Sequence, residues 1–450
     1  MKTPTFRGLK IVAPPTVHCL FASRPPRQLL LQVLFVLVFI FSLGRPVWAL
    51  DENLVFDQMI DRYSKDMRCG NQRDFPGWER RQVSNPKDGY KIRYSRFGCT
   101  LSDRGALVIL PGRGDGSYEY FEIAIDFIER GFGPVYVIDH RGQGLSPRLL
   151  DNRHKGYVAR FEDYVDDAEA FVAAVENDLE LLGSGADPVM NLTTNSMGGA
   201  IGIGLFQRLG SENPFRSAAF LGAMISVNYH SFTGTPATML NLQIYSETGA
   251  LLQAWWRCHV VTFWNPGRCE EYAVESAANG YQSGTRKFSP NTEAIMTNSA
   301  ARYDLRTHML DVFDWSTIAT EEYDESENWA GPQLGGATNS WVREAARFNR
   351  EMREPSRLEN MVHVPVMLLT GTRDLRSYRP YADYLGRAPD LSNHIDFCER
   401  LNIGSIATKG HDICEFVALR GGFHELFMER DSERQQALDT IDRFFRSHSE

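Results

Sequence analysis

Residues 187–207, DPVMNLTTNSMGGAIGIGLFQ, decide the predicted fold. An apolar run over residues 188–194 stops at Asn195, and a run of small, helix-compatible residues begins after Ser196. This pattern predicts a strand, a sharp turn and a helix, with Ser196 at the apex of the turn. A serine on such a turn presents its hydroxyl to open space, so the stretch predicts Ser196 as a catalytic nucleophile.

The positions around Ser196 fit this interpretation with one departure. Neighbouring segments crowd the positions two before and two after such a serine, so both positions favour small residues. Gly198 meets the requirement, whereas Thr194 replaces the first glycine of the usual G-x-S-x-G pattern. Because the motif is incomplete, an ordinary serine at the start of a core helix is the competing interpretation.

Short apolar runs alternate with helical patterns along most of the chain. Strands are predicted at residues 90–97, 105–110, 134–138, 188–194, 218–224, 364–370 and 417–419. Further helices are predicted at residues 52–64, 117–130, 161–182 and 432–447, the third with its acidic residues on the outer face. Strands alternating with helices indicate a mostly parallel sheet covered on both faces, an α/β fold.

The alternation is lost between residues 227 and 360, a segment rich in aromatic residues. An insertion of this length between two strands of one sheet is most simply a lid over the strand ends. Its aromatic side chains are expected to form mainly the core of the lid itself. The predicted organisation is a leader at residues 1–49, a core in two parts at 50–226 and 361–450, and a lid (cap) at 227–360.

The leader differs in composition from the rest of the chain. It contains six basic residues, no acidic residue and an apolar run at residues 29–43. Val47-Trp48-Ala49 places small residues where a signal peptidase reads them, which predicts cleavage after Ala49. An uncleaved N-terminal membrane anchor is the alternative. Under both interpretations the body of the protein is exported, to be periplasmic or secreted.

Cysteine usage agrees with export. Cys19 lies in the leader, which leaves six cysteines for the exported body. An even number in an oxidising compartment indicates disulfides, and the simplest connectivity pairs neighbours along the chain. The predicted pairs are Cys69–Cys99, Cys258–Cys269 and Cys398–Cys414, with buried free thiols as the alternative. No C-x-x-C spacing occurs, so neither a metal site nor redox chemistry is expected.

The net charge of −9 limits the partners of the protein. An acidic chain is not expected to bind nucleic acid, and it gains no electrostatic attraction to an anionic membrane surface. No protein partner is predicted from the sequence.

A glycine-rich turn, PGRGDG at residues 111–116, follows a predicted buried strand. It lacks the Lys-Ser/Thr of a P-loop and the dinucleotide fingerprint, and its Arg-Gly-Asp triplet recurs by chance in unrelated chains. A glycine-lined loop at this place can instead present a backbone N–H to an oxyanion. This interpretation predicts the backbone amides of Arg113 and Met197 as the two oxyanion donors.

A second turn, DHRGQGLS at residues 139–146, follows the next predicted strand. We interpret this turn as structural rather than catalytic, with Asp139 and Arg141 binding backbone groups.

Ser196, Asp374 and His424 occur in the chain order nucleophile, acid, base. Each lies just past the carboxyl end of a predicted strand, the edge at which open α/β sheets hold their sites. An imidazole within hydrogen-bond reach takes the serine proton, and a carboxylate holds the imidazole in the required tautomer. The joint pattern therefore predicts a serine hydrolase. The alternatives for the acid are Asp412 and Glu425, and those for the base are His411 and His140.

Further stretches accompany these residues: PGRGDGSYEYFEIAIDFIERGF, VIDHRGQGLS, FEDYVDDAEAF, NSMGGAIG, GTRD, GGFHELFMERDSERQQAL and, in the predicted lid, NSAARY and GGATNSWVRE. Together they resemble the α/β-hydrolase family that contains bacterial lysophospholipases and monoacylglycerol lipases, most of all its bacterial lysophospholipase branch. The resemblance runs from about residue 90 to the C-terminus. It implies hydrolysis of a carboxylic ester on a single-chain lipid through an acyl-serine intermediate, without a cofactor.

The resemblance implies the same roles for individual residues. Ser196, Asp374 and His424 match the triad positions, and Arg113 and Met197 match the oxyanion-hole positions. The expected partner is a lipid-like small molecule, with transient membrane association left open.

Two features depart from the family pattern: Thr194 and the longer, cysteine-bearing segment at residues 227–302. Monoacylglycerol lipase and broad carboxylesterase activity therefore stay open beside lysophospholipase activity. An inactive binding protein of the same fold is the alternative from another class, and Thr194 is its only support. Epoxide hydrolases and dehalogenases use an aspartate nucleophile, which Ser196 opposes.

Overall fold

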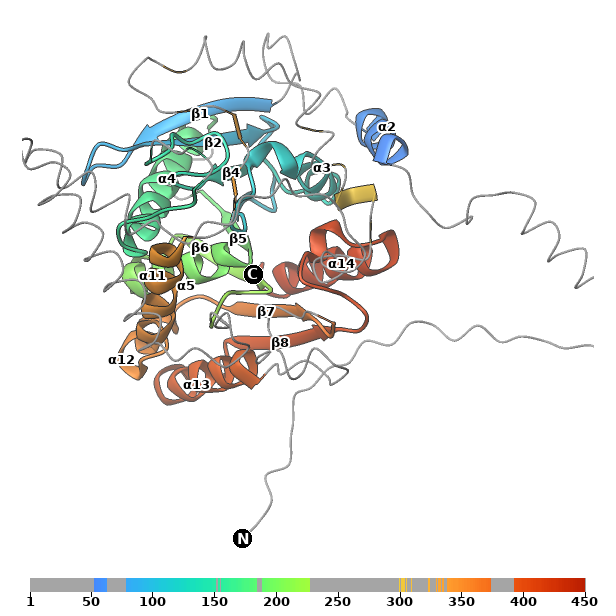
Figure 1. The fold of residues 1–450 in the computed structure, drawn as a ribbon. Coiled ribbons are helices and arrows are strands. Elements are labelled where there is room, and N and C mark those ends of the chain that lie inside the picture. The colour runs from blue at the N-terminus through green and yellow to red at the C-terminus, as the bar shows by residue number, and fades with distance from the viewer. Residues whose placement is uncertain are drawn as a thin grey trace, which may run out of the picture.

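The structure is a computed structural model of the 450-residue chain (Figure 1). It describes residues 52–62, 78–150, 155–183, 188–226, 338–373 and 392–449, and the shorter pieces 153, 299, 301–303, 305, 309, 323, 329, 331–332 and 334–335.

The described strands form one eight-stranded sheet in the order β1-β2-β4-β3-β5-β6-β7-β8. They are β1 (Trp78–Ser84), β2 (Lys91–Phe97), β3 (Ala106–Leu110), β4 (Val135–Asp139), β5 (Met190–Asn195), β6 (Phe215–Leu221), β7 (Val366–Gly371) and β8 (Cys414–Leu419). β1 and β2 pair antiparallel at one edge, β2 runs antiparallel to β4, and the remaining neighbours are parallel. The predicted α/β class with a mostly parallel sheet is confirmed.

Helices cover both faces of this sheet (Figure 1). One face carries α4 (Glu162–Leu181), α5 (Met197–Leu209), α11 (Asn339–Glu351), α12 (Pro355–Leu358) and α13 (Ser392–Lys409). The other carries α2 (Glu52–Arg62), α3 (Phe121–Glu129) and α14 (Asp431–Ser447). Short 3₁₀ turns are η2 (Ser117–Tyr120), η3 (Gly210–Glu212), η7 (Glu359–Met361) and η9 (Leu426–Met428).

The central strands show why the sequence contains continuous apolar runs rather than alternating ones. On β3, Val108 and Leu110 belong to the hydrophobic cluster under α4 and α5, whereas Leu107 and Ile109 belong to the cluster under α3 and α14. Successive side chains of a strand point to opposite faces, and both faces of β3 are buried. Every position therefore has to be apolar.

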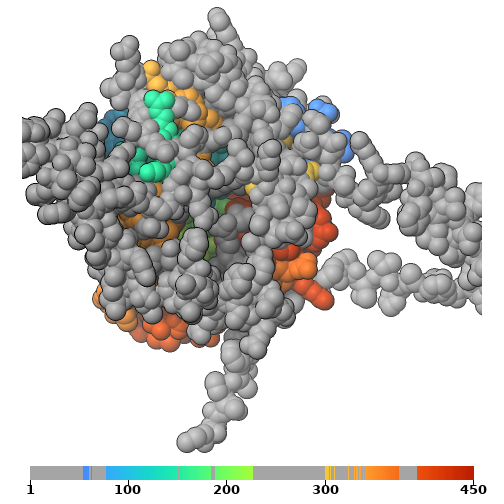
Figure 2. All heavy atoms as spheres, in the orientation of Figure 1, coloured from blue at the N-terminus to red at the C-terminus, as the bar shows by residue number. Residues whose placement is uncertain are grey.

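Some elements differ from those predicted. β1, α11, α12 and α13 are additional. α11 and α12 lie in the segment predicted as a lid. β1 is a charged edge strand, and α13 exposes Ile403 and Ile406, so neither of these two has a clean apolar pattern. In the space-filling view α13 lies at the lower edge of the molecule (Figure 2). β6 begins and ends three residues earlier than predicted, and β8 begins at Cys414 rather than at residue 417.

The prediction that the acidic residues of α4 lie on its outer face is wrong for several of them. Asp167 and Asp178 are 0% and 5% exposed. Asp178 is buried because Arg81 and Arg96 of the neighbouring strands reach it, at 2.5 Å and 2.9 Å. Arginine partners from other elements thus make burial of these carboxylates tolerable.

Parts of the predicted lid pack on the core. The α11 side chains Trp341, Ala345 and Phe348 belong to the same hydrophobic cluster as α4 and α5. Trp329 donates its indole N–H to the carbonyl of Gly144 at 3.1 Å, and Arg302 binds Glu122 at 2.9 Å. Residues 227–298 lie outside the described residues, so the lid and its boundaries stay a prediction.

The predicted disulfide Cys398–Cys414 is confirmed and links α13 to β8. Cys99 is also disulfide-bonded. Cys69, Cys258 and Cys269 lie outside the described residues, as does the predicted leader. Among the helices of the described ranges, none is long and apolar enough to cross a bilayer.

Candidate active site

Ser196 occupies the turn between β5 and α5, as predicted. Its backbone dihedrals are φ 51° and ψ −111°, and it is the one non-glycine residue with positive φ in the described part of the chain. Its N–H donates to the carbonyl of Leu221 at 2.9 Å, and its carbonyl accepts from the amides of Gly199 and Met224. Such a conformation costs roughly 1–3 kcal/mol and persists only where its surroundings enforce it.

Gly198 shows why the position two after Ser196 has to be glycine. A Cβ at Gly198 would lie 2.0 Å from the carbonyl oxygen of Leu110 and 2.6 Å from that of Pro111. The start of α5 therefore rests directly on the backbone that leads from β3 into the PGRGDG loop. This contact brings the first amides of the helix, Met197 among them, beside the loop that contains Arg113.

Thr194 fits because α5 makes room for it. Its methyl Cγ2 lies 3.2 Å from where a Cβ of Gly202 would be, and its Oγ1 lies 3.3 Å from where a Cβ of Gly199 would be. Two glycines on the facing helix thus provide the space that the first glycine of the motif usually provides. Thr194 is fully buried, and its hydroxyl finds no hydrogen-bond partner among the residues that the structure describes.

His424 lies at the same end of the sheet as Ser196. A Cβ at Gly222, which has φ +49°, would lie 3.2 Å from the His424 Nδ1. Gly222 directly follows Leu221, whose carbonyl holds the amide of Ser196. Ser196 and His424 therefore both contact the Leu221-Gly222 dipeptide at the carboxyl end of β6. His424 is 3% exposed, as expected for a base shielded from bulk water.

The predicted acid, Asp374, lies outside the described residues and stays a prediction. The chain that leads to it is well fixed. The amide of Thr372 donates to the carbonyl of Leu419 at 2.8 Å, and the amide of Arg373 donates to the carbonyl of Gly422 at 2.8 Å. The loop after β7 is thus bound to the loop that carries His424.

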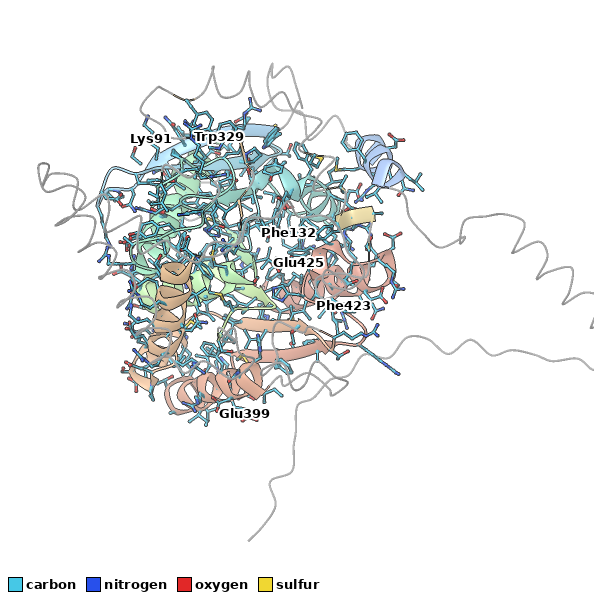
Figure 3. The ribbon with its side chains drawn as sticks, in the orientation of Figure 1. Lys91, Phe132, Trp329, Glu399, Phe423 and Glu425 are labelled. Carbon is cyan, nitrogen blue, oxygen red and sulfur yellow. A yellow bond between two sulfur atoms is a disulfide. The ribbon has the colours of Figure 1, made fainter. Side chains whose placement is uncertain are left out.

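The alternative acids and bases lie in other surroundings. His411 and Asp412 are exposed and precede β8, at the opposite end of the strand from His424. Glu425 is buried, and its carboxylate accepts from the side-chain amide of Asn195 at 2.5 Å. This bond joins the residue before Ser196 to the residue after His424. Glu425 and Phe423 belong to the segment between β8 and α14 (Figure 3).

His140 is bound elsewhere. Its Nε2 lies 3.1 Å from the carbonyl oxygen of Pro111 and, because a carbonyl only accepts, this nitrogen carries the proton. Burial lowers the pKa of His140 to about 4, so the ring is neutral near pH 7.

The PGRGDG loop holds Arg113 between two fixed neighbours. The amide of Gly112 donates to the Asp115 carboxylate at 3.0 Å, and the amide of Gly114 donates to the side-chain oxygen of Gln143 at 2.5 Å. The Arg113 guanidinium binds the carbonyl of Gly335 at 2.9 Å, away from the loop backbone. The side chain of Arg113 is thus bound away from the loop backbone, and the role of its backbone amide as an oxyanion donor stays a prediction.

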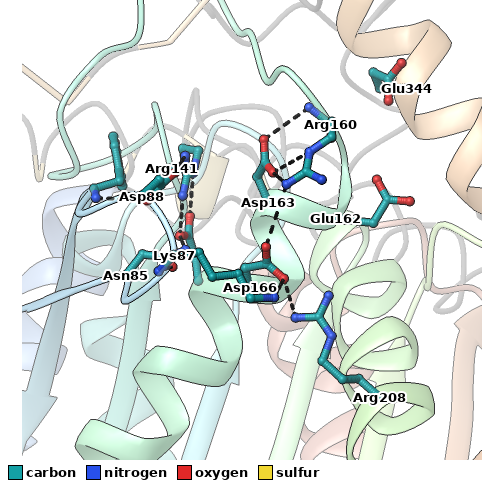
Figure 4. Close-up of polar contacts among 12 residues, drawn as sticks. Asn85, Lys87, Asp88, Arg141, Arg160, Glu162, Asp163, Asp166, Arg208 and Glu344 are labelled. Atoms are coloured by element: carbon teal, nitrogen blue, oxygen red, sulfur yellow. Dashed lines mark hydrogen bonds and ion pairs between the residues drawn. The ribbon is translucent and has the colours of Figure 1, made fainter.

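The turn at residues 139–146 is structural at Asp139, as predicted. The buried carboxylate accepts from the amide and hydroxyl of Ser117 and from the amide of Leu145. Burial raises the pKa of Asp139 to about 6, while these hydrogen bonds act in the opposite direction. The prediction that Arg141 binds backbone is wrong: its guanidinium reaches the carboxylates of Asp167 and Asp88, at 2.7 Å and 2.5 Å (Figure 4).

The sheet order, the strained serine between β5 and α5, and a histidine after the last strand define an α/β hydrolase. Residues 102–392 match the family model Hydrolase_4, described as serine aminopeptidase, S33. This chain belongs to that family. The resemblance to α/β hydrolases of the lysophospholipase and monoacylglycerol lipase type is thereby confirmed.

Individual relatives agree with the assignment. The chain is 27% identical over 365 residues to lysophospholipase L2 of Escherichia coli K12, covering 80% of this chain and 86% of that protein. A soluble variant of the monoglyceride lipase of Saccharomyces cerevisiae matches with a TM-score of 0.51 at 14% identity, over 86% of this chain and 98% of that chain. A carboxyl esterase from Bacillus coagulans matches with a TM-score of 0.50 at 13% identity, over 83% and 99%. At these identities the two structures show the fold alone.

We predict that Thr194→Val keeps the activity and the stability of the protein, whereas Thr194→Gly lowers the stability. Valine has the shape of threonine and removes a buried hydroxyl that has no partner in the described structure, so stability should be unchanged or up to about 1 kcal/mol higher. Glycine leaves a cavity and a more flexible strand, which should cost roughly 2 kcal/mol. Urea unfolding of the three proteins measures these differences. A Thr194→Val variant several kcal/mol less stable than wild type would show that the hydroxyl is bound.

A second prediction concerns the pH dependence of stability. The folded pKa of His140 is lowered to about 4 from an ordinary value of 6.5, so between these pH values the unfolded chain binds a proton that the folded protein does not. The stability that a neutral His140 contributes is present above pH 6.5 and lost as pH falls towards 4. The stability advantage of wild type over His140→Asn should therefore shrink by up to about 3 kcal/mol between pH 7 and 4. Urea unfolding of both proteins at several pH values measures this change. If His140 did not titrate, the difference in unfolding free energy between the two proteins would stay the same from pH 7 to 4.

Proposed function

We propose that this protein is a serine esterase that hydrolyses the carboxylic ester of a single-chain lipid, releasing a fatty acid from lysophospholipid. The observation that carries the proposal is the strained Ser196 turn, held by Leu221, with His424 against the adjacent Gly222. The similarity to lysophospholipase L2, which extends over 80% of this chain, supports the lipid substrate class.

In the proposed reaction, His424 takes the proton of the Ser196 hydroxyl as the oxygen attacks the ester carbonyl. The resulting oxyanion lies between the backbone N–H groups of Arg113 and Met197. His424 then gives its proton to the alcohol oxygen of the lipid, and the C–O bond breaks to leave an acyl-serine. Water, deprotonated by His424, attacks this second ester and releases the fatty acid and free Ser196.

The two amides matter because charge develops on the carbonyl oxygen only in the transition state. Donors fixed in advance stabilise that charge without reorganising, and removing one typically costs roughly 3–4 kcal/mol. Asp374 is the proposed partner of His424, holding its tautomer and stabilising the imidazolium. The proposed lid would supply the apolar wall for the acyl chain.

We also propose that the protein acts outside the cytoplasm, as a periplasmic or secreted enzyme. The Cys398–Cys414 disulfide and the disulfide-bonded Cys99 support an oxidising compartment. Intact-mass measurement of the protein recovered from its native host should show cleavage after Ala49 and a mass increase of about 6 Da on full reduction, from three disulfides. A full-length chain would contradict cleavage of the leader. A chain whose mass does not change on reduction would contradict the predicted disulfides.

We predict that Ser196→Ala lowers kcat for lysophospholipid hydrolysis by roughly 10⁴-fold or more, since the nucleophile is lost. Fatty-acid release from lysophospholipids, monoacylglycerols and short aryl esters measures the activity and the substrate preference together. A fluorophosphonate probe should label wild type and Ser211→Ala, a control at an exposed serine after α5, but not Ser196→Ala.

Each adverse outcome of this experiment contradicts a different part of the proposal. Equal labelling of Ser196→Ala and wild type would exclude Ser196 as the nucleophile. Turnover of short aryl esters without turnover of lipids would exclude the lipid substrate and leave the esterase. Faster turnover of monoacylglycerol than of lysophospholipid would favour a monoacylglycerol lipase. A wild-type protein that neither labels nor hydrolyses any ester would favour an inactive binding protein.

A further inference from the structure

Gln143 contacts Gly114, which follows Arg113, and Met197, so it reaches both sides of the proposed oxyanion hole. It is 2% exposed, and its side-chain oxygen accepts from the amide of Gly114, the residue after Arg113, at 2.5 Å. Its side-chain nitrogen lies 3.3 Å from the Tyr164 hydroxyl and 3.7 Å from the sulfur of Met197. The orientation of the amide follows from its partners, because a backbone N–H can only donate and must face the oxygen.

The same turn holds the other end of the PGRGDG loop. His140 donates its Nε2–H to the carbonyl of Pro111 at 3.1 Å. Pro111 and Gly114 are therefore both bound by side chains of the turn at residues 139–146, and Gly112 and Arg113 lie between the two bound points. A loop of four residues fixed at both ends leaves little freedom to the amide of Arg113.

The turn that makes these contacts is itself fixed. The amide of Gln143 donates to the carbonyl of His140 at 2.8 Å, and the carbonyl of Gln143 accepts from the amide of Ser146 at 2.9 Å. Asp139 ties the turn to Ser117, and Arg141 ties it to α4 through Asp167. The side chains of His140 and Gln143, which bind Pro111 and Gly114, therefore project from a turn whose own backbone is held in place.

We propose that Gln143 is a positioning residue for catalysis, which holds the Arg113 amide and Met197 in the arrangement that the oxyanion requires. The inference rests on the proposed function. Gln143 itself does not reach the reacting carbonyl in this scheme. It acts through preorganisation: oxyanion donors stabilise the transition state only if they are in place beforehand, and a displacement of about 1 Å can cost on the order of 100-fold in rate.

The test is Gln143→Met, which keeps the length of the side chain and removes the acceptor of the Gly114 amide. We expect kcat for ester hydrolysis to fall by roughly 10- to 100-fold, with KM within about threefold of wild type, because the oxyanion is present only in the transition state. Affinity for a trifluoromethyl ketone analogue of the lipid, which forms an oxyanion with Ser196, should fall by a similar factor. All rates are expressed per active site, counted by fluorophosphonate labelling.

The chain offers a matched control in Gln207. This buried glutamine also binds a backbone group, donating to the carbonyl of Met352 at 2.6 Å, and, like Gln143, its side-chain nitrogen lies 3.7 Å from a methionine sulfur, that of Met361. It lies on α5 eleven residues after Ser196, outside the site. Gln207→Met should lower the melting temperature without changing kcat per active site, which separates a loss of stability from a loss of positioning.

Amide hydrogen exchange of the peptide that contains residues 111–116 decides the inference independently of activity. Exchange in this peptide should be faster in Gln143→Met than in wild type and in Gln207→Met. Unchanged exchange, or a kcat within twofold of wild type, would overturn the positioning role. If wild type hydrolyses no ester, the proposed function fails, and unchanged exchange would additionally refute the contact between Gln143 and the loop.

Discussion

The backbone of Ser196 is the constraint on which the site depends. A positive φ at a serine is unfavourable, and here it is enforced by hydrogen bonds to Leu221, Gly199 and Met224. Two of these partners belong to β6 or to the residues just after it. Gly222, which follows Leu221 in the chain, lies against His424. One strand end therefore strains the proposed nucleophile and receives the proposed base, which explains how side chains 228 positions apart in sequence come to share one site.

Because the site is assembled from loops, it depends on the register of the parallel strands. Asn195 pairs with Leu221 across β5 and β6, and Leu369 pairs with Val417 across β7 and β8. A shift of one residue in the first pairing would remove the bond that holds the Ser196 amide. The continuous apolar strands do not fix a register by alternation, since both faces are buried. Close contacts, such as that between Gly198 and the backbone carbonyl of Leu110, select the register instead.

The sequence predicts those helices and strands whose pattern of apolar residues indicates burial. It does not predict the roles of residues that act through contacts with residues far away in the chain. Apolar runs followed by glycine or small polar residues indicate β3, β4, β5 and β7 and hence the edge at which Ser196 and His424 lie. Gln143 resembles any polar residue of a glycine-rich turn. Its role depends on Gly114 and Met197, which are 29 and 54 residues away in the chain. Similarly, Arg141 binds buried carboxylates of α4 rather than the local backbone, because long side chains reach partners that turn chemistry does not indicate.

Thr194 shows which structural requirement the first glycine of the G-x-S-x-G motif reflects. The glycine two before the serine is favoured because α5 approaches β5 closely at that point, so the requirement concerns the space shared by two elements. In this chain Gly199 and Gly202 lie opposite Thr194 and leave that space on the helix side. The side chain that the strand carries at this position is thus accommodated by the absence of side chains on the helix. Thr194 therefore gives no support to the interpretation of this protein as an inactive relative, since the strained turn at Ser196 forms with threonine in place.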